Sequence, residues 1–168
     1  MRRATYLLVV VALALGLAAP AAVAQPTTFR AVLSGADEVP PRDTQARGVA
    51  TFKVSADGTE IEYRLVVANI ENVFAAHIHC GDADDVAPVG VTLFMGAPAS
   101  GPVNGVLATG TITEPDAGNT CGWADLEDVI DAFESGNAYV NVHTSDGVDP
   151  PDTGPGDFPG GEIRGQIF

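Results

Sequence analysis

Histidine, cysteine and basic side chains are scarce in this sequence. The 168 residues include 3 His, 2 Cys and 8 Lys or Arg against 22 Asp or Glu, for a formal net charge of -14 at pH 7. A surface this acidic repels phosphate backbones and anionic lipids, which argues against nucleic-acid and membrane partners. The serines lack a nucleophile-elbow context, and no glycine loop of the phosphate-binding kind is present. No residue is therefore assigned a catalytic role.

The first 24 residues have the pattern of a secretory signal peptide. Arg2 and Arg3 precede an apolar run over residues 7–17, and residues 22–24 form a small-residue cleavage signal. We expect residues 1–24 to be removed, and residues 25–168 to form one domain with a secreted or periplasmic location. After cleavage, we expect no membrane attachment.

The two cysteines are expected to form a disulfide, because export places Cys80 and Cys121 in an oxidising compartment. The alternative is a thiolate ligand at Cys80, next to His79. Strand alternation places Cys80 on the core side together with Ile78, which favours the disulfide.

Short segments that alternate apolar and polar residues dominate the rest of the chain. Residues 48–55 and 60–70 flank Asp57-Gly58 and predict a β-hairpin. Asp125 precedes an apolar stripe at helical spacing that stops at Gly136, which predicts a short α-helix over about residues 125–135. Other alternating segments span residues 29–33, 74–80, 89–94, 105–113, 138–144 and 161–168. The pattern predicts an all-β fold, an antiparallel immunoglobulin-like or Greek-key β-sandwich or barrel with one short α-helix.

All three histidines lie in predicted strands. Side chains alternate faces along a strand, so His77 and His79 share one face. The set predicted to face the core in these two strands is Phe74, Ala76, Ile78, Val140 and Val142. The set predicted to face outward in the second strand is Tyr139, Asn141 and His143.

If these two strands are neighbours, the imidazoles of His77, His79 and His143 converge into a metal site. Three neutral nitrogen ligands without a thiolate favour copper first and zinc second. Imidazole must be neutral to bind a metal, so we expect affinity to fall below the unperturbed histidine pKa of about 6.5. The alternative is a non-catalytic extracytoplasmic interaction or matrix module, with an unidentified protein partner and no metal.

Four motifs occur in an order that resembles the chordin-type (CHRD) domain, in its bacterial-type secreted single-domain form. They are Leu33-Ser34-Gly35 with Glu38-Val39-Pro40-Pro41, then residues 76–81 (AHIHCG), 139–144 (YVNVHT) and 161–166 (GEIRGQ). The resemblance extends from about Phe29 to Phe168 and implies a secreted, immunoglobulin-like all-β module. In animal chordins such domains accompany growth-factor-binding modules. Here the acidic segment at residues 144–160 is longer than in similar chains, and we expect it to cover the site or to add one.

A fainter similarity is to the copper site of the copper/zinc superoxide dismutases, whose copper ligands would correspond to His77, His79 and His143. No histidine lies between His79 and His143, which excludes the bridging imidazole and the zinc ligands. The similarity therefore implies at most a copper-only, dismutase-like enzyme. Candidates for a second shell or an anion guide on the outward strand faces are Asn141, Glu162 and Arg164. For Arg164, the competing interpretation is a surface salt bridge to Glu162 or to an aspartate.

Overall fold

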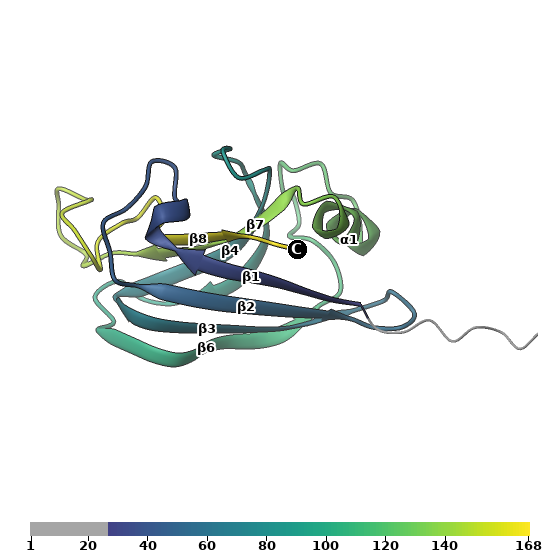
Figure 1. Ribbon diagram of the computed structural model, residues 1–168, viewed down its shortest axis with the longest axis horizontal. Helices are drawn as coiled ribbons and strands as arrows, with labels where there is room; N and C mark the ends of the chain where they lie inside the picture. Colours follow the sequence, from purple (N-terminus) through teal and green to yellow (C-terminus); the bar gives the residue numbers. More distant parts are fainter. Residues whose placement is uncertain (1–26) are drawn as a thin grey trace, which may run out of the picture.

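The computed structural model describes residues 27–168 (Figure 1), so the expected signal peptide lies outside the described residues. This part of the chain forms eight strands, one α-helix and one 3-10 helix. In chain order they are β1 (Thr28–Ser34), η1 (Gly35–Asp37), β2 (Arg47–Val54), β3 (Ile61–Glu71), β4 (Val73–Cys80), β5 (Val89–Met95), β6 (Pro102–Ile112), α1 (Leu126–Glu134), β7 (Ala138–Thr144) and β8 (Ile163–Gln166).

The strands form one antiparallel sheet in the order β5-β4-β7-β8-β1-β2-β3-β6. The sheet curls until its two edge strands, β5 and β6, approach each other. Across this seam the Tyr63 hydroxyl donates a 2.7 Å hydrogen bond to the carbonyl of Leu93. The predicted all-β class with one short helix is confirmed, in a nearly closed, barrel-like form.

Helix α1 lies against the sheet and contributes to the core. The Asp125 side chain accepts hydrogen bonds from the amides of Glu127 and Asp128, which satisfies two otherwise unpaired helix donors. Phe133 packs against Phe29 and Phe52, with ring centroids 5.5 and 5.1 Å apart. Burying each such side chain contributes about 1.5–3 kcal/mol, so the helix is fixed by packing as well as by its cap.

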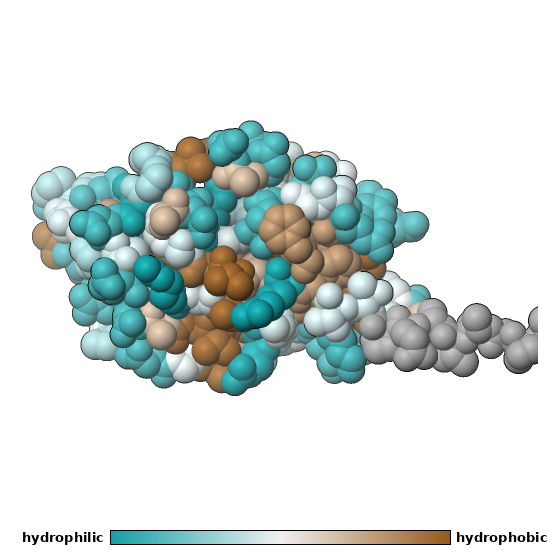
Figure 2. All heavy atoms as spheres, viewed as in Figure 1, coloured by the Kyte–Doolittle hydropathy of each residue, from teal (hydrophilic) through white to brown (hydrophobic). Residues whose placement is uncertain are grey.

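The outer face of β1, β2, β3 and β6 is open to solvent. The register places Val32, Val49, Val66 and Val106 in one row across these four strands. Figure 2 shows a hydrophobic strip that crosses this face between strongly hydrophilic side chains. The inner face is apolar and buried, as the alternation in the sequence predicts.

Strands β4, β7 and β8 are covered on both faces. Every residue of β7 is buried, including Tyr139, Asn141 and His143, which are only 2%, 5% and 8% exposed. Their predicted outward side is therefore not a solvent face. The loops around residues 81–88 and 145–160 lie over this side, away from β2, β3 and β6 (Figure 1).

An irregularity in β4 corrects one core assignment. The register against β7 shifts between Val73 and Ala75, so Val73 joins the core cluster with Ala76 and Ile78. Phe74 does not join it, and its ring centroid lies 6.1 Å from that of His143. The prediction that Phe74 faces the core is wrong, because an extra residue in a strand reverses the alternation that precedes it.

A disulfide joins Cys80, at the end of β4, to Cys121 in the segment before α1. The predicted disulfide is confirmed, and Cys80 has no thiolate available for a metal. Within residues 27–168, no helix is long and apolar enough to cross a membrane.

Candidate metal centre

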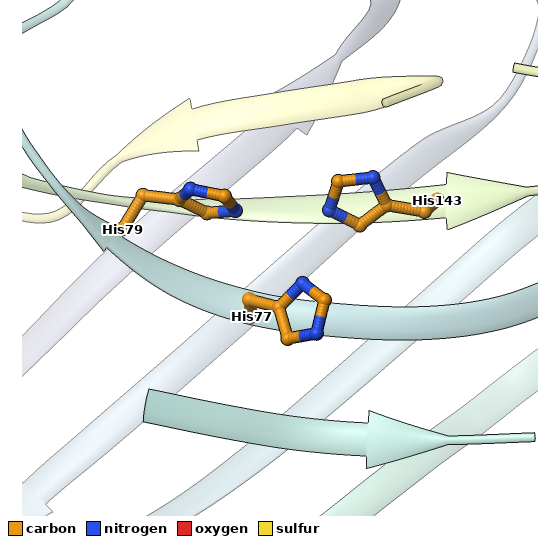
Figure 3. A group of neighbouring side chains, drawn as sticks. All are labelled: His77, His79 and His143. Atoms are coloured by element: carbon orange, nitrogen blue, oxygen red, sulfur yellow. The ribbon is translucent and has the colours of Figure 1, made fainter. Parts of the chain in front are cut away.

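The three histidines lie together on neighbouring strands. His77 and His79 are on β4 and His143 is on β7, and these strands pair antiparallel with Ala75 opposite His143. One nitrogen from each ring can be chosen so that all three lie within 4.8 Å of one another. In Figure 3 each ring turns one nitrogen toward the middle of the group. The predicted convergence of the three imidazoles is therefore present in the fold.

Two of the rings are oriented by backbone carbonyls. His79 Nδ1 lies 2.8 Å from the Ala87 carbonyl oxygen, and His143 Nδ1 lies 3.0 Å from that of Pro159. A carbonyl only accepts hydrogen bonds, so each Nδ1 carries the proton and each neutral ring keeps its lone pair on Nε2. This is the arrangement in which metal-binding histidines are commonly held.

The nitrogens left over are buried without a hydrogen-bond partner in the described part of the chain. They are His77 Nδ1, His79 Nε2 and His143 Nε2. A buried polar atom without a partner costs about 1–3 kcal/mol. Three such atoms in one group could all be satisfied by one common ligand that accepts three lone pairs.

Burial also sets the protonation state of the site. Desolvation lowers the pKa of His79 to about 4 and that of His143 to about 4, in each case against a smaller opposing effect of the carbonyl hydrogen bond. Desolvation lowers the pKa of the half-buried His77 as well, and the Asp116 carboxylate partly opposes this. All three rings are therefore neutral at pH 7, as metal ligation requires.

The spacing fits a metal ion after a small adjustment. Imidazole nitrogens bind zinc at about 2.0–2.1 Å, which places neighbouring ligand nitrogens roughly 3–4 Å apart. From an upper separation of 4.8 Å, the rings need to approach by about 1 Å, which small side-chain rotations supply.

Arg164 is an internal residue and not a surface one. It is 2% exposed, and its guanidinium carbon lies 3.4 Å from the centroid of the Tyr139 ring. Its nitrogens donate to the carbonyls of Asp82, at 2.6 Å, and Asp85, at 2.5 Å. The expected surface salt bridge is wrong, because Arg164 instead fastens the loop at residues 81–88 over the sheet.

Tyr139 connects this loop to the histidines. Its ring stacks on that of His79, with centroids 4.9 Å apart and planes 4° from parallel, and its hydroxyl accepts from the Ala87 amide at 3.1 Å. Arg164 and Tyr139 together hold Ala87, whose carbonyl orients His79. Arg164 is thus a buried residue that affects His79 indirectly, by holding the loop whose Ala87 carbonyl orients the His79 ring.

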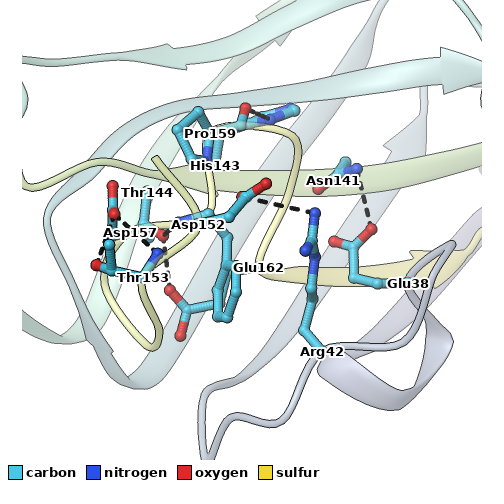
Figure 4. A network of polar contacts seen from close by, with 11 residues as sticks. Glu38, Arg42, Asn141, His143, Thr144, Asp152, Thr153, Asp157, Pro159 and Glu162 are labelled. Atoms are coloured by element: carbon cyan, nitrogen blue, oxygen red, sulfur yellow. Dashed lines mark hydrogen bonds and ion pairs between the residues drawn. The ribbon is translucent and has the colours of Figure 1, made fainter. Parts of the chain in front are cut away.

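Glu162 belongs to a network of polar contacts on the other side of the histidine group, near His143 and Pro159 (Figure 4). It is fully buried and accepts hydrogen bonds from the hydroxyls of Thr44 and Thr144, at 2.6 and 2.7 Å, and from the Gly156 amide at 2.9 Å. These contacts anchor the acidic loop whose Pro159 carbonyl orients His143. The loop covers one side of the histidine group, which is one of the two roles expected of it.

Asn141 contacts a carboxyl group that the sequence reasoning did not assign to the site. Its amide nitrogen donates to Glu38 Oε2 at 3.5 Å, and burial raises the pKa of Glu38 to about 7 although Arg164 and Arg42 oppose this. Gly161 packs against both side chains and leaves no room for a side chain of its own, since a Cβ there would lie 2.5 Å from Asn141 Oδ1 and 2.7 Å from Glu38 Oε1. The sequence feature that could have indicated Glu38 is its place in the Glu38–Pro41 motif, one of the four motifs that resemble the CHRD domain.

The comparison with protein families identifies the chain. The family described as CHRD domain matches residues 29–151, well over half of the sequence, and the protein therefore belongs to the CHRD-domain family. The match includes all three histidines and ends before the residues 161–166 motif. No curated protein matches the chain, and no solved structure matches it.

Proposed function

We propose that this CHRD-domain protein acts outside the cytoplasm and binds a copper-type metal ion through His77, His79 and His143. The observation that carries the proposal is the group of three neutral, buried ring nitrogens that face one another without hydrogen-bond partners in the described residues. The export pattern at residues 1–24 and the disulfide support the location.

The donor set favours copper. Imidazole suits copper, zinc, iron and nickel, whereas calcium and magnesium prefer oxygen ligands. Among divalent ions of the first transition row, copper binds nitrogen sites most tightly, which places zinc second. A bound copper ion would supply one-electron redox chemistry at this position.

We propose binding without turnover as the function. Arg164, the candidate anion guide, already directs two nitrogens to backbone carbonyls and stacks on Tyr139. That use of its guanidinium supports a positioning role in preference to substrate attraction. A copper-only dismutase would need another cation to attract superoxide.

Metal titration of the mature protein, residues 25–168, tests the proposal. We expect one copper ion per chain by elemental analysis after chelator exchange, and loss of that ion in His143→Ala and His79→Ala. The matched control is Asp146→Asn with Asp149→Asn, which removes acidic-loop carboxylates and leaves the histidines intact. Copper retained equally by His143→Ala and wild type would overturn the proposal. A superoxide assay on copper-loaded protein, with no rate above that of free copper, is the expected result for binding alone.

A further inference from the structure

The few basic residues of this acidic chain gather on one face of the sheet. Of the 8 Lys or Arg residues, Arg2 and Arg3 lie outside the described residues. Arg42 is half-buried and Arg164 is buried. All the others are exposed on the outer face of β1, β2 and β3, and they are Arg30, Arg47, Lys53 and Arg64. The protein therefore has a basic surface within a strongly acidic one.

The basic side chains flank the row of valines on this face, called here the valine row: Val32, Val49, Val66 and Val106. In the strand register, Arg30 and Arg64 lie in the row on one side of it, and Arg47 lies in the row on the other side. Figure 2 shows the hydrophobic strip with strongly hydrophilic side chains beside it. Within residues 27–168, none of these three arginines forms an ion pair, whereas Lys53 pairs with Glu62 at 3.8 Å.

This pattern fits a partner that presents an apolar side chain between carboxylates. Neighbouring strands are about 4.8 Å apart, so Arg30 and Arg64, on either side of β2, are separated by roughly 10 Å. Two like charges at this spacing repel each other, and a carboxylate between them relieves the repulsion through charge-assisted hydrogen bonds. Val32 and Val106 are 58% and 50% exposed, so the valine row offers apolar area next to these charges.

The acidic loop of the same chain has the complementary pattern. Residues 146–149 read Asp-Gly-Val-Asp, and Val148 is 66% exposed between the two aspartates. The Asp146 carboxylate accepts a 2.8 Å hydrogen bond from the Val148 amide, which holds the valine beside it. The loop lies away from β2, β3 and β6 (Figure 1), so it does not meet the valine row of its own chain.

We infer that the acidic loop of one copy docks on the valine row of a second copy, with Val148 against the valines and Asp146 and Asp149 at the arginines. A contact between two valine rows is disfavoured, because it would bring arginines against arginines. The loop and the row are different surfaces, so the contact is heterologous and builds a chain or a ring of copies. This inference does not depend on the proposed metal binding.

The net charge determines the conditions under which the copies associate. Two chains with a formal charge of -14 before signal removal repel each other at long range. At about 0.15 M salt the Debye length is about 8 Å, which screens this repulsion and largely retains the attraction between charges in contact. At about 1 M salt it falls to about 3 Å and the attraction weakens too. We therefore expect association to be strongest at intermediate salt.

Sedimentation equilibrium of the mature protein, residues 25–168, tests the contact. At about 0.15 M salt the average mass of wild type should rise with concentration. Arg30→Gln with Arg64→Gln should weaken association by about tenfold or more, because it removes charge pairs at the contact. The matched control is Ala117→Glu with Thr120→Glu, at exposed positions before α1. It changes the net charge by the same amount and should associate like wild type.

The loop variant gives a test whose sign is decisive. Asp146→Asn with Asp149→Asn reduces the net negative charge, so net repulsion alone would predict stronger association. The inference predicts association weakened by about tenfold or more, since the loop loses both carboxylates.

Mixing the arginine variant with the loop variant tests the heterologous geometry. Each pair then has one intact valine row and one intact loop, so the mixture should form dimers and no longer assemblies. Wild type that stays monomeric at every concentration and salt, or association unchanged in both variants, would overturn the inference. Monomeric wild type that binds polyglutamate through Arg30 and Arg64 would also overturn it, and would assign the face to a foreign acidic polypeptide.

Discussion

The sheet has an open half, formed by β1, β2, β3 and β6, and a covered half, formed by β4, β7 and β8. Both halves alternate side chains between two faces, but only the open half exposes its outer face to solvent. In β2 the inward side chains Phe52 and Val54 are buried, while Thr51 and Lys53, which alternate with them, are exposed. In β7 the alternation of polar and apolar residues is just as regular, yet all seven residues are buried. The difference is the cover that the loops around residues 81–88 and 145–160 provide. A polar strand face under such a cover is the place to look for a site.

The covered half contains buried polar atoms that lack hydrogen-bond partners, whereas polar side chains on the open face are in contact with water. Among the described residues, buried side-chain atoms without a partner include the three histidine nitrogens and oxygens of Glu38 and Asn141. On the open face of β1, β2 and β3, water satisfies polar side chains at little cost. Desolvating them is unfavourable, so the covered half gives up stability where the proposed ligand binds.

The largest contrast is expected between two arginines, one in each half. Arg164→Ala removes a buried side chain, its contact with Tyr139 and two hydrogen bonds to carbonyls, and we expect a loss of about 3–4 kcal/mol in the free energy of unfolding. Arg64→Ala, on the exposed face of β3, should change it by about 0.5 kcal/mol or less. Urea denaturation of both variants measures the difference. Equal effects would show that the loop cover contributes little.

A second contrast concerns two glutamates and depends on pH. The folded pKa of Glu38 is raised from 4.5 to about 7, so the folded state binds more protons than the unfolded state between these values, and stability falls as pH rises through this window. Glu38→Gln should therefore stabilise the protein by about 2–3 kcal/mol at pH 8 and by little at pH 4.5. Glu62→Gln is the matched control, because it removes the same charge from an exposed position on the open half. A constant difference across the window would contradict the burial of an ionisable Glu38.

The smallest expected effect is the pH dependence of copper affinity above pH 5. With the pKa of His79 and of His143 lowered to about 4, protons compete with the metal only near and below that pH. This moves the expected loss of affinity down from about 6.5, the value for unperturbed histidine. We expect a change of about tenfold or less between pH 8 and pH 5, then a steep fall near pH 4, measured by chelator competition. A steep fall centred at pH 6.5 would show that the rings are solvated.

Much of this structure could be predicted from local patterns. The β2–β3 hairpin, the Asp125 cap and the shared face of His77 and His79 each depend on neighbouring residues. These predictions depend on periodicity, which the sequence displays directly. The pairing of β4 with β7 was not predicted in this way, and it entered only as the condition under which the three histidines converge.

The remaining features depend on contacts between distant residues. The register shift near Phe74 arises from pairing with β7 and has no local signature. Arg164 and Glu162 were expected on an outward face. The distant loop at residues 81–88 encloses Arg164, and Thr44 together with the neighbouring acidic loop encloses Glu162. Glu38 reaches Asn141 from a different loop, so only the motif around Glu38, and no local chemistry, indicated its importance.

X-ray absorption spectroscopy on copper-loaded mature protein tests the central claim most directly. The account predicts a first shell of three nitrogen ligands at about 2.0–2.1 Å, with the multiple scattering typical of imidazole, and loss of this pattern in His143→Ala. A first shell of carboxylate oxygens, or a shell that is the same in wild type and His143→Ala, would contradict it.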